Sequence, residues 1–224
     1  MDVMLIILMI ALGIFFIFVS QGLSEKNGII NIYSIYNIIS FLLSFKLMDV
    51  MKININANIA LSSLFTSLTY LIIEKSTAKE YKNIIKQIFS INVILSIVIL
   101  LSSIYIGEIN DVNSVNMQNI FISNYKILIS YPIITLINQI VILLIYNTIK
   151  DTTQNINIRI ILTNLTTLMI ETILFCISSY IFSIKLIYLP VLIISNYLIK
   201  VIITSIYTPF ISYLIKLKKV KLWI

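Results

Sequence analysis

Long apolar runs separated by short polar connectors make up the pattern along this chain. A spanning α-helix needs roughly 20 predominantly apolar residues to cross a hydrocarbon layer of about 30 Å. The pattern therefore predicts an all-α, polytopic membrane helical bundle with about seven transmembrane helices. Asn31 and Asn37 interrupt the second run, and a count of six helices stays open. The seven runs fall at about 3–20, 29–48, 54–74, 87–107, 120–148, 160–184 and 187–215.

Composition leads to the same class of protein. Of the 224 residues, 59% are hydrophobic and 11% are charged, and the mean hydropathy is +1.04. A soluble domain has about 25% charged residues, so this chain has too little charge to cover a water-facing surface. Seven helices of about 20 residues use roughly 140 residues and leave only short connectors. We therefore expect residues 1–224 to form a single integral membrane domain.

Basic residues set the expected orientation, because they concentrate in cytoplasmic connectors. The connector 108–119 contains Glu108 and Asp111 and has no basic residue, so it is expected outside. Alternation then places the N-terminus outside and the C-terminus inside, in a cell (inner) membrane. The net charge of +7 is better explained by topology than by a nucleic-acid partner. The basic residues expected inside are Lys26, then Lys75, Lys79, Lys82 and Lys86, then Lys150 and Arg159, then Lys216, Lys218, Lys219 and Lys221.

Several classes of enzyme do not fit the sequence. The chain has no histidine, and Cys176 is its only cysteine. This composition excludes histidine or multi-cysteine metal sites and Cys/His nucleophiles. No GxxxxGK[ST] sequence is present to bind ATP. Glu74 and Glu171 lie at different expected depths, which argues against a carboxylate dyad. We expect a protein that is not an enzyme and has no metal or cofactor.

Two ionisable residues lie where the membrane interior is expected. Glu171 and Lys200 are each in the middle of an apolar run, where a charge costs about 2.5–3.5 kcal/mol. One interpretation is a structural ion pair between neighbouring helices. The other is that one or both face a polar substrate cavity. Amides and hydroxyls nearby either join helices or form a hydrogen-bonding pocket; they are Asn138, Gln139, Thr163, Asn164, Thr166 and Thr167.

The order of several short motifs resembles that of a known family. The family motif has an Asp, an acidic residue four positions later, a Tyr-Gly pair and a basic run. In residues 69–85, Glu74 and Lys75 match the acid and its follower, and Tyr70 stands where the family has Asp. The basic run is matched by Lys79, Glu80 and Lys82, while Ser76 and Thr77 stand in place of Tyr-Gly.

Further matches lie in the second half of the chain. The family's Gly-Gln pair corresponds to Asn138 and Gln139, and its Arg followed by Ser-Thr corresponds to Arg159 and Thr163. An acid before an apolar run ending in Phe corresponds to Glu171 through Phe175, and a lysine within a helix corresponds to Lys200. The family's Thr-Pro before a Tyr corresponds to Thr208, Pro209 and Tyr213. Upstream, the residues that resemble family positions are Lys26, Gly28, Lys46 and Asn58.

These motifs span about residues 20–215 and resemble the queuosine precursor transporter family, also called the vitamin uptake transporter family. The resemblance implies a bacterial or archaeal importer of 7-deazapurine precursors of queuosine or archaeosine, such as preQ0, preQ1 or queuine. It would place Glu171 as the acceptor for the N1–H and amine of the base, and Lys200 as a group that keeps Glu171 ionised or donates to the carbonyl. Gln139 and Asn164 would address the carbonyl and pyrrole edge, and Tyr70 or Phe175 would stack on the ring. The remaining candidate site residues are Asn138, Glu74, Lys46, Asn58 and Arg159.

Two other functions stay open at this point. The chain is alternatively a substrate-binding membrane subunit of a multi-component vitamin-type transporter, or a non-transporting membrane assembly protein in which the two charges join helices. A homodimer that encloses the pathway is also open. In every case the protein is expected to lie in the lipid bilayer. For the importer and for the substrate-binding subunit, the expected partner is a small 7-deazaguanine-type base.

Overall fold

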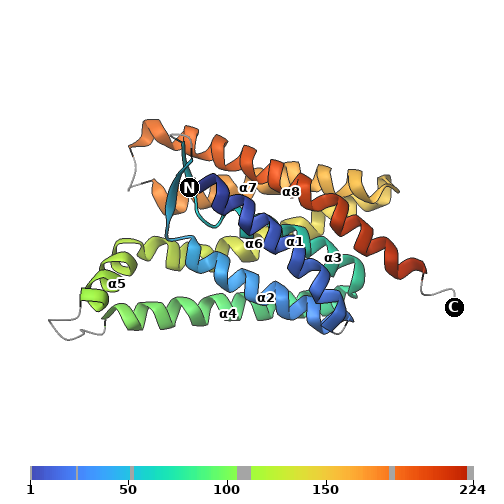
Figure 1. Ribbon diagram of the computed structural model, residues 1–224, viewed down its shortest axis with the longest axis horizontal. Coiled ribbons are helices and arrows are strands. Elements are labelled where there is room, and N and C mark those ends of the chain that lie inside the picture. Colours follow the sequence, from blue (N-terminus) through green and yellow to red (C-terminus); the bar gives the residue numbers. More distant parts are fainter. Residues whose placement is uncertain (1, 24, 51–52, 105–111, 182–184, 221–224) are drawn as a thin grey trace.

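Long helices that lie side by side form the structure, and each runs opposite to the one before it (Figure 1). The computed structural model describes residues 2–23, 25–50, 53–104, 112–181 and 185–220. A two-stranded antiparallel hairpin follows α2, with Leu47 opposite Asn56 and Val50 opposite Ile53. The elements are α1 (Asp2–Leu23), α2 (Glu25–Leu43), β1 (Leu47–Val50), β2 (Ile53–Asn56), α3 (Ile59–Lys75), α4 (Ala78–Ile104), α5 (Val112–Ser123), α6 (Tyr125–Thr152), α7 (Ile156–Tyr180), the 3-10 turn η1 (Leu186–Tyr188) and α8 (Leu189–Val220).

Four helices in the described part of the chain are long and apolar enough to cross a membrane. They correspond to α4, α6 and α7 and to the segment Leu186–Lys216. Shorter apolar stretches occur at Ile6–Phe15 in α1 and Gly28–Leu43 in α2. The α3 helix has 17 residues and is about 26 Å long at 1.5 Å per residue. The class of all-α membrane bundle is therefore supported, while the predicted count of seven spans is not confirmed by helix length.

Two segments differ from the hydropathy prediction. Helix does not extend over the end of the run 29–48 or the start of the run 54–74. Residues 47–50 and 53–56 pair there as strands. Ile and Asn alternate over 53–56, and alternation of apolar and polar residues is a strand pattern that an average over hydropathy hides. The connector expected over 108–119 contains most of α5, which ends at Ser123 before a non-helical Asn124 with φ −111° and ψ 23°.

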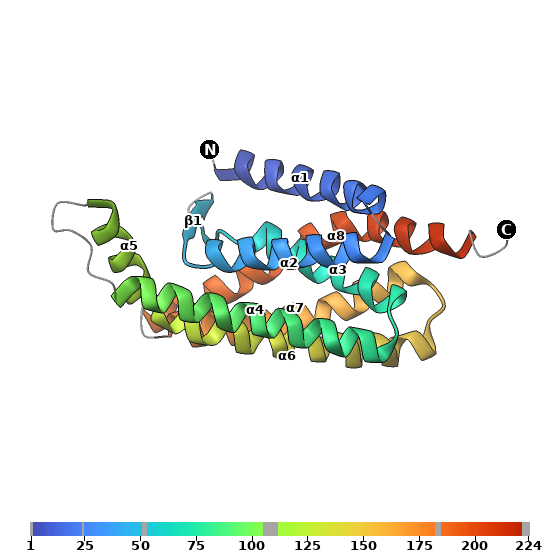
Figure 2. The same cartoon turned by 90° about the horizontal axis from the view of Figure 1, so that it is seen from below.

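The α3 helix is the central helix of the bundle. Every residue from Ile59 to Ile73 is buried, and α3 packs against α1, α2 and α8. Figure 2 shows α1 on one side of the molecule and α4 and α6 on the other, with α2, α3 and α8 between them. Small hydroxyl side chains let neighbouring helices approach closely. In α3 these are Ser62, Ser63, Thr66, Ser67 and Thr69, and each donates a hydrogen bond to a carbonyl three or four residues earlier.

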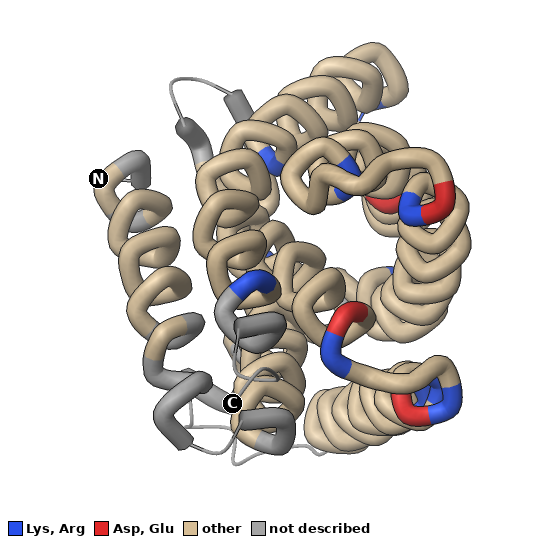
Figure 3. Tube along the Cα trace, turned by 90° about the vertical axis from the view of Figure 1, so that its right-hand side faces the viewer, with Lys and Arg blue, Asp and Glu red and all other residues tan. Residues whose placement is uncertain are grey.

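Charged residues gather at one end of the bundle, which Figure 3 views directly. At this end α3 and α6 finish and α4 and α7 begin, so the connectors around Lys75 and Lys150 lie together, as the orientation argument expected. We call it the basic end. Glu108, Asp111 and Lys221 lie outside the described residues, as do the side chains of Lys26, Lys218 and Lys219.

Candidate functional site

A buried ion pair joins the last two long helices. Glu171 is in the middle of α7 and Lys200 is in the middle of α8, and the Nζ of Lys200 lies 2.7 Å from Oε1 of Glu171. The two side chains are 14% and 6% exposed, respectively. An ionised group at this depth needs a partner or a polar surrounding. The helix-to-helix pairing that the sequence left open is therefore present.

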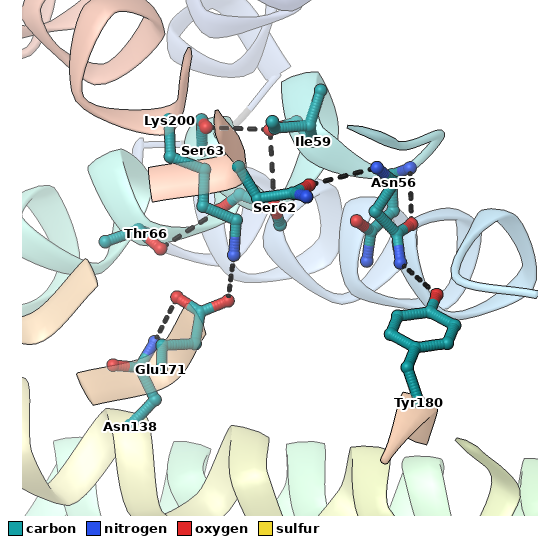
Figure 4. A network of polar contacts seen from close by, with 11 residues as sticks. Asn56, Ile59, Ser62, Ser63, Thr66, Asn138, Glu171, Tyr180 and Lys200 are labelled. Atoms are coloured by element: carbon teal, nitrogen blue, oxygen red, sulfur yellow. Dashed lines mark hydrogen bonds and ion pairs between the residues drawn. The ribbon is translucent and has the colours of Figure 1, made fainter. Parts of the chain in front are cut away.

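A third helix also reaches the carboxylate. Asn138 of α6 donates from Nδ2 to Oε2 of Glu171 at 3.0 Å. Figure 4 shows Lys200 and Asn138 pointing at the same carboxylate from opposite sides. Both oxygens of Glu171 therefore have a donor, and each donor is on a different helix. A carboxylate held in this way faces a fixed direction.

A small cavity lies beside the ion pair. Its volume is about 30 Å³, which is room for about two water molecules. A bicyclic base is larger than two waters, so binding one needs side chains of the cavity wall to move. The wall comes from β2, α3, α6, α7 and α8 and consists of Asn56, Asn58, Ser62, Phe65, Tyr131, Ile134, Thr135, Asn138, Glu171, Thr172, Phe175, Cys176, Asn196 and Lys200.

An amide network closes the cavity on the side of the hairpin. Asn56 donates from Nδ2 to the hydroxyl of Tyr180 at 2.9 Å, and its backbone N–H donates to Oδ1 of Asn196 at 2.9 Å. The Oδ1 of Asn56 accepts from the backbone N–H of Asn58 at 3.1 Å. These bonds connect β2 to α7, α8 and the start of α3. Sequence reasoning included Asn58 and missed the other three residues. The spacing of Asn196 one turn before Lys200 was the available signal for one of them.

Gln139 lies in a separate buried cluster. Its Oε1 accepts hydrogen bonds from Tyr33 at 2.7 Å, Tyr81 at 2.9 Å and Thr69 at 3.3 Å. These partners come from α2, α4 and α3, so Gln139 connects α6 to three other helices. It does not line the cavity beside Glu171. Its sequence neighbour Asn138 does, because consecutive residues of a helix point about 100° apart.

Tyr70 and Asn164 form a third buried contact. The hydroxyl of Tyr70 donates to Oδ1 of Asn164 at 2.6 Å, which joins α3 to α7. The rings of Tyr70 and Tyr146 lie with centroids 5.3 Å apart. Neither Tyr70 nor Asn164 lines the cavity. The roles that the resemblance gave them at the base therefore lack a direct contact in this conformation.

A second ionic cluster lies at the basic end. Oε1 of Glu74 is 2.7 Å from Nη1 of Arg159 and 3.1 Å from Nζ of Lys150, and it accepts from the hydroxyl of Tyr146 at 2.9 Å. Arg159 also donates to the carbonyl of Thr153 at 3.1 Å. The Glu74 side chain is only 10% exposed. Three donors therefore surround this oxygen, and Glu74 is an ion-paired rather than a solvated helix-end carboxylate.

The candidate residues thus divide into two groups, with Lys46 apart from both. Those that line the cavity are Glu171, Lys200, Asn138, Asn58 and Phe175. Those that lie in the Gln139, Tyr70 and Glu74 contacts are Gln139, Tyr70, Asn164, Glu74 and Arg159. Lys46 belongs to neither group, because it is exposed beside the hairpin, where its backbone bonds Leu43 and Ala57.

The fold and the site define an α-helical membrane protein with a charged, buried cavity between helices. Comparisons with protein-family models, with curated proteins and with solved structures found no match for this chain. The resemblance to queuosine precursor transporters therefore rests on its sequence motifs alone. Among the described residues, no three His, Cys, Asp or Glu side chains come together in a way that could hold a metal ion.

Proposed function

We propose that this chain is a membrane importer of 7-deazapurine precursors such as preQ0, preQ1 or queuine. The observation that carries the proposal is the buried carboxylate of Glu171, which lines a cavity between helices and is held by two donors. Intramembrane ionisable groups that face a cavity are typical of substrate sites in transporters. The cavity also contains amides, hydroxyls and aromatic rings, which suits a flat, polar heterocycle better than an ion or a lipid.

The donors now on Glu171 suggest how the base binds. A 7-deazaguanine presents an N1–H and an exocyclic amine side by side, and one carboxylate accepts both. Lys200 and Asn138 occupy these two acceptor positions in the structure. The base replaces them one for one. Its carbonyl lies next to N1–H, so the displaced ammonium of Lys200 gains that oxygen as a new acceptor.

Aromatic rings of the wall provide the stacking surface in this proposal. Tyr131 and Phe175 both line the cavity, with ring centroids 6.4 Å apart and planes at 88°. Stacking on such a ring contributes about 1–3 kcal/mol per base. Because the cavity has room for only about two waters, the rings and Lys200 separate as the base enters. This requirement makes binding an induced opening of a closed site.

The proposal includes seven spans, with the N-terminus outside and the basic end in the cytoplasm. In this arrangement α1, α2 and α3 cross the bilayer beside the four longer apolar helices. Two observations support it: the long helices run antiparallel to one another (Figure 1), and the described connectors rich in lysine lie at one end (Figure 3). Cytoplasmic connectors are the ones that carry excess lysine and arginine.

Uptake in a precursor-requiring strain tests the function. The strain expresses this chain, receives labelled preQ0, preQ1 or queuine, and is scored by queuosine in its tRNA. We expect uptake with the native chain and its loss with Glu171→Gln at equal membrane level. The matched control is Asp151→Asn, the same chemical change at an exposed helix end, and it should transport normally. Intact uptake with Glu171→Gln would refute the role of the carboxylate.

One observation favours a second function, that of a non-transporting assembly protein. The Glu171–Lys200 pair joins α7 to α8 at 2.7 Å, as a purely structural pair would. Exchanging the charges with Glu171→Lys and Lys200→Glu separates the two functions. An assembly protein tolerates the exchange, because the attraction is unchanged. An importer loses uptake, because the carboxylate no longer faces the base from α7.

A further inference from the structure

Polar residues recur every fourth position on three helices that meet at the cavity. On α7 they are Arg159, Thr163, Thr167 and Glu171; on α3 they are Asn58, Ser62, Thr66, Tyr70 and Glu74; on α8 they are Asn196, Lys200, Thr204, Thr208 and Ser212. Four residues advance about 40° beyond one turn of 3.6 residues, so each set forms one continuous stripe that winds slowly around its helix. Glu74 and Glu171 are 10% and 14% exposed, and the other members are all buried.

Each stripe continues from the cavity to the basic end. On α7, Glu171 lies at the cavity and Arg159 lies at the basic end, twelve residues apart, which is about 18 Å along the helix. On α3, Asn58 lines the cavity and Glu74 closes the same path at the basic end. The three stripes together are called the polar seam below.

The threonine hydroxyls of the polar seam bond within their own helices. Thr163 donates to the carbonyl of Arg159 at 2.8 Å, and Thr167 donates to that of Thr163 at 2.9 Å. On α8, Thr204 donates to the carbonyl of Lys200 at 2.8 Å. Their hydrogens are therefore satisfied, while their oxygens keep capacity to accept a hydrogen bond from water or a solute. An apolar interface has no such capacity.

Side-chain bonds between α3 and α7 close the polar seam at two levels. Tyr70 bonds Asn164 at 2.6 Å. Nearer the basic end, Glu74 bonds Arg159 at 2.7 Å, and the exposed Lys150 of α6 adds a contact at 3.1 Å. The outer of these two levels, Glu74 with Arg159, is ionic and lies at the boundary with water. A charged pair in this position can separate and be solvated, which a pair deep in the bundle cannot do at low cost.

We propose that the polar seam is the path by which the solute leaves the cavity towards the basic end, and that the Glu74–Arg159 pair is its gate. This inference rests on the proposed function, because it requires that a solute crosses the membrane. Separation of Glu74 from Arg159 releases α3 from α7 at the basic end. The inner Tyr70–Asn164 bond, which joins the same two helices, parts with it. Water then hydrates the hydroxyl oxygens of the seam down to the Glu171 cavity.

The test measures access of a charged thiol reagent to the polar seam. Thr167→Cys is introduced into a chain with Cys176→Ala, and a membrane-impermeant methanethiosulfonate ammonium reagent is added to vesicles of either orientation. With Glu74 intact, the cysteine should react slowly from both faces. With Glu74→Gln, it should react about tenfold faster from the face of the basic end alone, a typical size for coupling between two sites. Arg159→Gln should give the same increase, because it removes the same bond from the other helix.

The matched control is Leu165→Cys, which is two residues from Thr167 on the exposed, lipid-facing side of α7. It should stay unreactive in every variant, because a charged reagent does not enter the hydrocarbon. Lys150→Gln removes only the contact between Lys150 and Glu74, so it should raise the reaction rate of Thr167→Cys by less. This milder variant replaces the other two if they reach the membrane poorly. The inference is overturned if Thr167→Cys gains no reactivity in any of the three variants, or if Leu165→Cys gains as much.

The labelling uses no 7-deazapurine, so it separates the two proposals. If Glu74→Gln raises the labelling of Thr167→Cys but no precursor is taken up, the exit path is supported and the proposed substrate is rejected. Uptake of a precursor without gated labelling would retain the substrate and reject the path.

Discussion

Replacing Lys200 by methionine isolates the energetics of the buried ion pair. Methionine has a similar length and is flexible, so the change alters the charge more than the packing. It leaves the carboxylate of Glu171 largely buried at 14% exposed, with the Asn138 amide at 3.0 Å as its remaining side-chain donor. The variant therefore has an ionised group inside the bundle that has lost its counter-charge.

The structure gives the expected size of this effect. Removing one partner of a buried pair typically costs about 3–5 kcal/mol, because the other charge stays buried. The bond from Asn138 and the partial exposure of Glu171 place this case near the lower value, about 3 kcal/mol. For a chain of 150–250 residues, 1 kcal/mol shifts Tm by about 2–4 °C. We therefore expect Tm to fall by about 6–12 °C in Lys200→Met.

The double variant Glu171→Gln with Lys200→Met should recover most of this loss. It removes both charges, and replacing a whole buried ion pair by neutral groups is often close to neutral in stability. Thermal unfolding of the native chain, the two single variants and the double variant in one detergent gives the coupling energy. Asp151→Asn, at an exposed position, should change stability by no more than about 0.5 kcal/mol. Additive effects of the two single changes would refute the reasoning.

Three further outcomes follow from other contacts. The charge exchange Glu171→Lys with Lys200→Glu should keep Tm near the native value and abolish uptake, and retained uptake would count against a fixed base-binding carboxylate. Gly13→Ala should lower the free energy of unfolding by about 1–3 kcal/mol, because a Cβ there would lie 2.7 Å from the hydroxyl oxygen of Tyr207. Adding Tyr207→Phe should recover this stability in thermal unfolding. If it does not, the hydroxyl is not the obstacle. Asn56→Ala breaks the side-chain hydrogen bonds from the hairpin to α7 and to the start of α3, so it should lower stability by about 1–3 kcal/mol. An unchanged Tm would contradict a role of Asn56 in closing the cavity on the side of the hairpin.

Several features of the site could be predicted from the sequence because they follow from the cost of charge in a membrane. Glu171 and Lys200 are isolated charges in apolar runs, and a bundle has few ways to satisfy them other than by pairing. Asn138 was a candidate as an amide in the helix pair that includes Glu171 and through the family motifs. Glu74 and Arg159 were candidates only through the family motifs. The structure unites them in one contact that no spacing rule connects, since 85 positions separate the two residues.

Other features were hidden because hydropathy records how apolar a helix is and not where it lies. The α3 helix is completely surrounded, yet its run looks like the others. Its serine and threonine content was the signal, because small hydroxyl residues favour central, closely packed helices. The hairpin at 47–56 was hidden in two apolar runs. Asn56 was missed as a result, because a residue at the end of a strand was read as part of a helix.

Direct binding of matched bases to the purified chain tests the central claim, which is that Glu171 reads the N1–H and amine edge of a 7-deazaguanine. The measurement compares labelled preQ1 with the analogue that lacks only the exocyclic amine, for the native chain and for Glu171→Gln. Each bidentate contact of this kind discriminates by about 1–3 kcal/mol. We predict that the native chain prefers preQ1 by about ten- to a hundredfold and that Glu171→Gln loses this preference. Equal binding of the two bases by the native chain would contradict the account.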